Sequence, residues 1–386
     1  MKVRAITVGR ESTAPLDHQE IAKAGQFADQ FRTAFADIGV PVQTVRLATQ
    51  PFPQYLGGLQ ERQLIQFAQD LQECCHDNGI DYCALGPVNP HIVTEARLLQ
   101  FLPALISETE MIFASAILGG LEYPVSSTVA HAIARVIREI ALATRGGFGN
   151  LRFAGLVNCP PHIPFFPAAF HWGEPAFSIA LESADVVAAA CFSDSDSTTT
   201  RIRIREELET RIRPVQKIAQ RFATQGFRFS GIDLSPAPGP DPDTSIGYAL
   251  ERLGYGYFGE PGTLAAAAIV TTALKETQLI TCGYCGLMLP VLEDVGLAER
   301  NNQGLLRLSS LLAYSAVCGT GLDTIPLPGD VSEKELTALL LDVAALGWKL
   351  GKPLSARLLP IPGKRAGERT EFAFSYFVNT RVMSIE

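Results

Sequence analysis

The residues between Cys318 and Asp330 combine one thiol and two carboxylates in a stretch rich in glycine and proline. A cysteine beside Gly319 and Gly321 can present a thiolate next to backbone N–H groups that hold an anion, so Cys318 is a candidate nucleophile or thiol acid/base. The alternative is a buried cysteine at a helix end that packs as a small hydrophobe. Asp323 is a candidate orienting carboxylate, or else a turn or cap residue like Asp330.

Two histidines and a glutamate share an aromatic, proline-broken stretch at residues 162–174. His171 with Glu174 is a candidate proton-transfer pair, because imidazole changes its charge near neutral pH. Metal binding and a hydrogen bond that staples the loop are the alternatives. Gly173 and Pro175 disfavour a helix here, so the spacing gives no support for zinc ligands on one helix face.

Other polar residues follow apolar runs. Asp233 closes one run and Ser235 comes just after it, at a strand end where α/β proteins bind ligands; the alternative is a turn closed by bonds to backbone amides. Glu293 begins an acidic pair with Asp294, which suits carboxylate catalysis or cation binding, or else a solvated loop. Arg357 is a candidate anchor for a substrate carboxylate through two hydrogen bonds.

Common cofactor and hydrolase motifs are absent or weak. Cys282 and Cys285 form a lone CxxC, and the two further ligands of a zinc site are not evident. The glycines at 146, 147 and 149 precede a strand instead of following one, which is the wrong order for a dinucleotide loop. No GxxxxGK[ST], HExxH or GxSxG occurs. The cofactor is therefore unknown.

Short apolar runs alternate with helical patterns along most of the chain. The runs are expected to be strands and cover residues 3–8, 42–47, 82–85, 111–116, 153–157, 177–181, 229–233, 279–282, 324–327 and 355–359. The helical patterns cover residues 21–38, 62–75, 127–142, 204–222, 262–274, 305–317 and 333–350. Such alternation predicts a mostly parallel sheet with covering helices, and we expect one domain over residues 1–386.

Two local signals place the cysteine stretch between helices. Ser332 and Glu335 have capping-box spacing, which predicts a helix start after the Pro-Gly-Asp turn that ends at Asp330. Cys318 should therefore end the preceding helix. Asp323 then lies at the mouth of a short strand, where ligand-binding groups of α/β proteins are usually found.

Composition limits the partners. The 386 residues are 47% hydrophobic, with a net charge of -8 and a pI near 5.4, which argues against a nucleic-acid surface and favours a small-molecule ligand. The arginines at 201–213 alternate with glutamates and predict an ion-paired helix face. No apolar run reaches the roughly 20 residues of a membrane span, and no leader is recognised, so we expect a cytoplasmic protein with reduced cysteines.

The order of these pieces resembles the bacterial and archaeal family catalogued as domain of unknown function 711. The resemblance covers nearly the whole chain. It is carried by residues 3–9, by Ala169 to His171 with Gly173 and Glu174, by Asp233 to Ser235 with Ala237 and Pro238, by Gly286 with Pro290, Val291, Glu293 and Asp294, by Ala316 to Cys318 with Gly321 to Asp323, and by Arg357 with Pro360, Gly363 and Lys364. The chain departs from the family at Glu260-Pro261 and at Cys285.

The resemblance implies a ten-stranded α/β barrel like that of pyruvate formate-lyase and other glycyl-radical enzymes, with two parallel five-strand halves packed antiparallel. It does not carry over the radical mechanism. Those enzymes need a glycine in a C-terminal Arg-Val-x-Gly motif, and the nearest string here has Ser384 at that place. The resemblance also suggests an ACT-domain regulatory protein as a partner, and a homodimer is the base-rate expectation.

Three hypotheses follow for the function. The first is an enzyme that acts on a small polar metabolite at the barrel mouth by thiol or acid/base chemistry. Its expected catalytic residues are Cys318, His171, Glu174 and Asp233, and its expected substrate-binding residues are Ser235, Glu293, Asp323 and Arg357. The second is a non-catalytic protein that binds or senses an amino-acid-like small molecule. The third is an enzyme that holds a divalent cation on Glu174, Asp233, Glu293 and Asp323.

Overall fold

The computed structural model describes residues 1–193, 196–223 and 226–385. Within them, nine strands form one sheet in the order β7-β6-β1-β2-β3-β4-β5-β9-β8. The strands are Lys2–Gly9 (β1), Val42–Ala48 (β2), Tyr82–Val88 (β3), Ile112–Gly119 (β4), Phe153–Val157 (β5), Ala176–Glu182 (β6), Arg228–Ala237 (β7), Gly321–Pro328 (β8) and Leu354–Ile361 (β9). The expected mixed α/β class is confirmed.

The sheet has a parallel centre and two reversed edges. Strands β1 to β5 run parallel to one another. At one side β6 pairs antiparallel with β1 and parallel with β7. At the other side β9 pairs antiparallel with β5 and parallel with β8. The expected five-strand parallel half is therefore present, and the four remaining strands oppose it from both edges.

The expected count of ten strands is wrong for the described residues. Residues 279–282 make only one isolated bridge, between Thr281 and Ile232 of β7. The chain turns away directly afterwards, because Gly283 and Cys285 have positive φ values of 73° and 44°. The same segment later forms a bridge from Pro290 to β8. One connection thus contacts both edge strands, where a tenth strand was expected.

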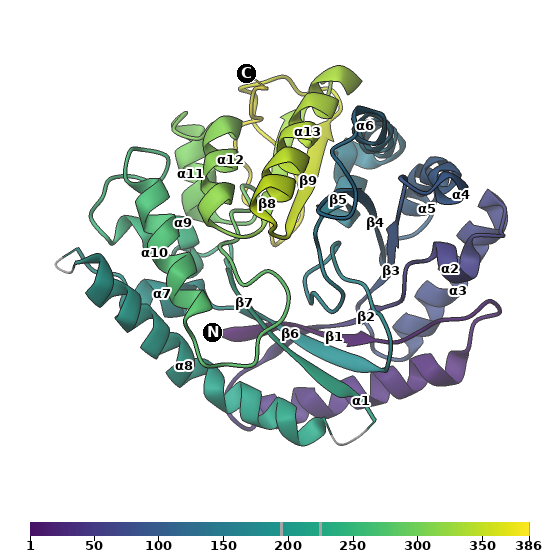
Figure 1. Ribbon diagram of the computed structural model, residues 1–386, viewed down its shortest axis with the longest axis horizontal. Coiled ribbons are helices and arrows are strands. Elements are labelled where there is room, and N and C mark those ends of the chain that lie inside the picture. Colours follow the sequence, from purple (N-terminus) through teal and green to yellow (C-terminus); the bar gives the residue numbers. More distant parts are fainter. Residues whose placement is uncertain (194–195, 224–225, 386) are drawn as a thin grey trace.

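Helices surround the sheet (Figure 1). The α-helices are His18–Ala36 (α1), Pro53–Leu56 (α2), Glu61–Asp77 (α3), Val93–Ala96 (α4), Leu102–Ser107 (α5), Ser127–Ala143 (α6), Ala184–Ala190 (α7), Ser197–Phe222 (α8), Ile246–Glu251 (α9), Thr263–Lys275 (α10), Val295–Asn302 (α11), Leu308–Val317 (α12) and Glu333–Leu350 (α13); three short 3-10 helices cover Arg97–Phe101, Arg145–Arg152 and Pro242–Thr244. The seven expected helices are confirmed: α8 begins seven residues earlier than expected, and the ends of the other six agree within three residues. No helix of the described chain is both long and apolar enough to cross a lipid bilayer.

Helix ends follow the sequence signals. The Ser332 side chain accepts from the Glu335 N–H, and the Glu335 carboxylate accepts from the Ser332 N–H, so α13 begins at the expected capping box. Helix α12 ends at Val317 and Cys318 caps its carboxyl end, as expected. On α8, Arg211 and Arg213 pair with glutamates one turn earlier, which confirms the predicted ion-paired face.

The connection between β5 and β6 packs its middle part against the strands of the sheet. The β5–β6 connection, residues 158–175, buries Ile163, Phe165 and Ala168 in one apolar cluster with strand residues such as Ala5 and Ala180. The alanine side chains on the strands are small, so they leave space into which the larger side chains of the connection pack. The connection thereby forms one wall of the molecule's interior.

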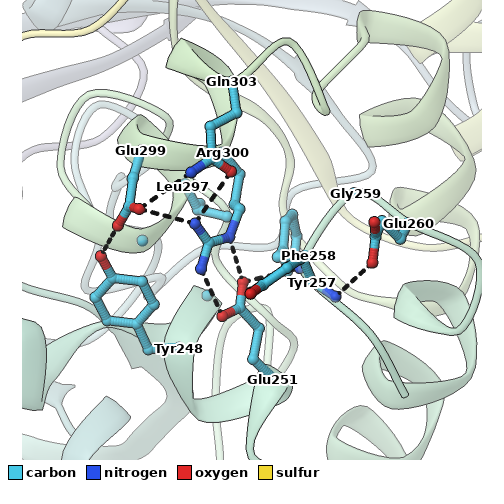
Figure 2. A network of polar contacts seen from close by, with 12 residues as sticks. Tyr248, Glu251, Tyr257, Phe258, Gly259, Glu260, Leu297, Glu299, Arg300 and Gln303 are labelled. Atoms are coloured by element: carbon cyan, nitrogen blue, oxygen red, sulfur yellow. Dashed lines mark hydrogen bonds and ion pairs between the residues drawn. The ribbon is translucent and has the colours of Figure 1, made fainter. Parts of the chain in front are cut away.

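A polar network fastens α9 to α11 and to the loop after α9 (Figure 2). The Arg300 guanidinium donates to both Glu251 oxygens, at 2.7 and 2.8 Å, and to Glu299 at 2.9 Å. Its Cζ atom also lies 4.4 Å from the centroid of the Tyr257 ring. Two-point ion pairs of this kind fix relative orientation as well as distance.

Candidate functional site

A central cavity of about 100 Å³ lies inside the sheet, toward the amino ends of β1 to β4. Charged and aromatic side chains from distant parts of the chain line it. They are Arg4, Gln43, Thr44, Arg46, Tyr82, Phe113, Leu151, Phe165, Phe166, Ala237, Pro238, Met288, Pro290, Glu293, Asp323, Arg357, Phe374 and Tyr376. This combination of apolar walls and a few converging polar groups is typical of small-molecule sites.

Two arginines and two carboxylates on this wall form a buried ion-pair chain. Arg357 donates through Nε to Asp323 at 2.6 Å and through Nη2 to Glu293 at 2.8 Å. Arg4 reaches the other Glu293 oxygen at 2.6 Å. Although burial opposes its charge, the ion pairs with Asp323 and Glu293 raise the pKa of Arg357 above its usual value. The Arg357 guanidinium therefore stays charged at neutral pH and holds both carboxylates in place.

Arg46 is arranged differently from these two arginines. Its Nε donates to the Thr44 hydroxyl at 3.0 Å, and its Cζ lies 5.1 and 5.7 Å from the ring centroids of Phe166 and Tyr82. No carboxylate of the described residues pairs with it. Burial, and then the nearby charges of Arg4 and Arg357, lower the pKa of Arg46 to about 9.

Three of the eight residues expected to form the site line this cavity together. They are Glu293, Asp323 and Arg357, which were expected to bind substrate. Within the described chain, Asp323 Oδ1 is held by Arg357, while Asp323 Oδ2 has no hydrogen-bond partner. One carboxylate oxygen is therefore free for a ligand.

Asp233 and Ser235 lie together but outside the cavity lining. Asp233 is fully buried and accepts hydrogen bonds from the N–H groups of Ser235, Tyr284 and Cys285 and from the Ser235 hydroxyl. The Ser235 oxygen accepts in turn from the Gly286 N–H. Burial raises the pKa of Asp233, and these bonds oppose the rise. The pair holds the 283–286 turn against β7.

Cys318 is also buried outside the cavity lining, with 1% of its surface exposed. Burial raises the pKa of its thiol to about 12, although the Lys352 charge acts in the opposite direction. Lys352 donates to the carbonyls of Ser315 and Ala316 at 2.9 and 3.3 Å and also contacts that of Cys318. This ammonium group satisfies the carboxyl end of α12.

His171 and Glu174 do not form a bonded pair in the described structure. His171 is buried and its Nε2 lies 2.8 Å from the Gly173 carbonyl oxygen, while its Nδ1 has no partner. Glu174 is exposed and borders a surface groove with Arg228. Burial lowers the pKa of His171, which favours the neutral ring. A proton-transfer role of this pair stays a prediction.

No three histidine, cysteine or carboxylate side chains of the described residues come close enough to hold a metal ion. Of the expected acidic cluster, Glu293 and Asp323 share the cavity, whereas Asp233 binds backbone amides and Glu174 faces the surface. Because arginines also neutralise the two cavity carboxylates, the arrangement does not favour a divalent cation.

Sequence reasoning missed Arg4 and Arg46. Arg4 lies near the amino end of β1 and Arg46 lies inside β2, whereas ligand-binding groups of α/β proteins are usually expected at the carboxyl ends of strands and in loops. The sequence does contain a signal for both arginines, because each is a charged residue within an apolar run that is expected to be a buried strand. Charged residues within buried strands almost always need a specific partner.

Comparison with known proteins gives a consistent family match. Residues 1–375 match the family described as Uncharacterised ACR (DUF711). A UPF0210 protein of Methanopyrus kandleri is 29% identical, covering 96% of this chain and 88% of its own. UPF0210 proteins of Carboxydothermus hydrogenoformans and Oenococcus oeni are 28% and 27% identical, covering 92% and 94% of this chain and 82% and 84% of their own. Similar proteins thus occur in archaea and bacteria.

Proposed function

We propose that this chain, which belongs to the uncharacterised family DUF711, binds a small polar metabolite in its central cavity. The observation that carries this proposal is the convergence of three arginines and two carboxylates on one partly aromatic cavity. Buried charges are costly unless they serve a structural pairing or a ligand. The charged groups and aromatic walls of this cavity suit a ligand that carries a charged group on a small apolar body.

A blocking variant tests this proposal. Ala237 is buried on the cavity wall, and Ala237→Leu would fill part of the space. Thermal shift against pooled polar metabolites should raise the Tm of the wild type by mass action and leave that of Ala237→Leu unchanged. Ala36→Leu, at an exposed position of α1, is the matched control and should respond like the wild type. Equal shifts in wild type and Ala237→Leu would contradict a site in this cavity.

A second candidate function is acid/base catalysis on the bound metabolite by Asp323. The free Oδ2 atom of this carboxylate supports it, since the other oxygen is already fixed by Arg357. The buried thiol of Cys318 gives less support to nucleophilic chemistry. Asp323→Asn should abolish conversion of a ligand found by the screen, as followed by mass spectrometry, while the ligand still binds.

A further inference from the structure

We infer that Arg46 anchors a carboxylate of the ligand, and that the ligand is a small monocarboxylate with an apolar body. This inference rests on the proposed function, because it names the class of molecule that the same cavity takes. It goes beyond a general polar metabolite by assigning the anionic group, its binding residue and the charge of the whole ligand.

The donors of Arg46 are only partly used by the protein. Thr44 takes the Nε hydrogen, and the Phe166 and Tyr82 rings lie near the guanidinium. Within the described residues, its two Nη groups have no hydrogen-bond acceptor, although Arg46 is only 9% exposed. A guanidinium fork matches the two oxygens of a carboxylate, so one bound carboxylate would satisfy both Nη groups at once.

The charges around the cavity indicate the charge of the ligand. The lining contains three guanidinium groups, on Arg4, Arg46 and Arg357, and two carboxylates, on Glu293 and Asp323. The two carboxylates pair with Arg4 and Arg357. Arg4 also contacts Glu182, whose charge is balanced by Lys2. The charge of Arg46 is left without an ion-pair partner among the described residues. A monoanion would neutralise the cavity, whereas a phosphate dianion would leave one buried negative charge without a partner.

The remaining walls suit an apolar body of limited size. Phe113, Phe165, Phe166 and Met288 are buried side chains around the space, and Phe113 and Phe166 meet edge to face at 5.1 Å. A cavity of about 150 Å³ holds the six carbons of benzene, so the roughly 100 Å³ here suits about four non-hydrogen atoms beyond the polar contacts. Short linear or branched carboxylates fall in this range.

Calorimetric titration with matched pairs of probes tests the inference. The panel contains butyrate, isovalerate, hexanoate and benzoate, each beside its neutral primary amide, and inorganic phosphate. At least one carboxylate should bind the wild type ten times or more tightly than its amide and more tightly than phosphate. Arg46→Met keeps a similar stem without the charge and should weaken that carboxylate at least tenfold, while Arg46→Lys should give an intermediate loss.

The outcomes separate the two proposals. If an amide binds as well as its acid, and Ala237→Leu abolishes both, the cavity is a ligand site but the carboxylate assignment is wrong. If Arg46→Met, checked for folding by circular dichroism, binds the acid as well as the wild type does, Arg46 is not the anchor. Should Arg46→Met fail to fold, the acid-to-amide ratio of the wild type decides. If phosphate binds more tightly than every carboxylate, the charge argument is wrong. If none of the carboxylates binds, the inference as a whole is wrong. If the metabolite pool also fails, the proposed function falls with it.

Discussion

At the scale of single residues, Asp233 and Asp323 show how alike carboxylates in a sequence acquire different roles in the fold. Both are buried aspartates at strand positions. Both Asp233 oxygens accept hydrogen bonds from Ser235 or from backbone amides of the 283–286 turn, whereas Asp323 keeps one oxygen free beside a cavity. Residue type and strand position therefore identified both as candidates, but only the hydrogen bonds distinguish them.

The contributions of Asp323 and Arg357 to the free energy of unfolding should be strongly coupled. Removing one partner of a buried ion pair costs about 3–5 kcal/mol, because the other charge is left uncompensated. Asp323→Asn and Arg357→Met should each lower the free energy of unfolding in urea, and the double variant should be more stable than the two losses together predict. Additive losses would show that the two side chains do not interact as the structure places them.

Cys318 should be unreactive in the folded protein. Its pKa of about 12 leaves almost no thiolate at pH 8, and its burial excludes reagents. Iodoacetamide at pH 8 followed by peptide mass spectrometry should therefore leave Cys318 unmodified in the native protein and label it fully in urea. The half-buried Cys159, Cys282 and Cys285 serve as internal comparisons. Fast native labelling of Cys318 would restore the nucleophile hypothesis.

At the scale of elements, apolar periodicity located seven helices and nine of the ten expected strands, because burial of one face of an element imposes this periodicity on its sequence. The tenth run, 279–282, has the same apolar signal, yet the positive φ of Gly283 turns the chain away after one bridge. Likewise, sequence pattern placed Glu293, Asp323 and Arg357 on separate elements but could not show that they meet. Their convergence depends on strand order, which periodicity does not contain.

The network around Arg300 should contribute more to stability than an exposed pair of the same type. Arg300→Lys keeps the charge but loses the two-point contact with Glu251, so we expect about 1–3 kcal/mol of lost unfolding free energy. Arg213→Lys is the control, because the Arg213–Glu209 pair lies on the exposed face of α8 and should contribute no more than about 0.5 kcal/mol. Thermal and urea unfolding measure both. Similar losses for the two variants would mean that Arg300 does not fasten α9 to α11.

At the scale of the whole molecule, the two edge strands of the sheet are linked through residues 279–293. This segment bridges β7 at Thr281 and β8 at Pro290, and in between its backbone lies against the Cys318–Thr320 turn. The contact depends on two glycines, since a Cβ built on Gly286 would lie 2.2 Å from the Gly319 Cα. Because Glu293 follows directly in this segment, the position of a cavity carboxylate depends on the same contact.

Gly286→Ala should therefore lower the free energy of unfolding and weaken ligand binding in the cavity at the same time. A side chain cannot fit within 2.2 Å of a backbone atom, so the segment must move, and we expect more than about 2 kcal/mol of lost unfolding free energy. Gly58→Ala is the matched control, because a Cβ there has no atom of the described residues within 4 Å, and it should change stability by about 0.5 kcal/mol or less. Urea unfolding measures the free energy of unfolding.

Titration with the carboxylate of the panel that binds most tightly measures binding in the cavity. Because Glu293 pairs with both Arg4 and Arg357, its displacement should also weaken the binding of that carboxylate. Unchanged stability in Gly286→Ala would contradict the tight backbone contact, and lost stability with full probe binding would show that the cavity is independent of the link between the sheet edges.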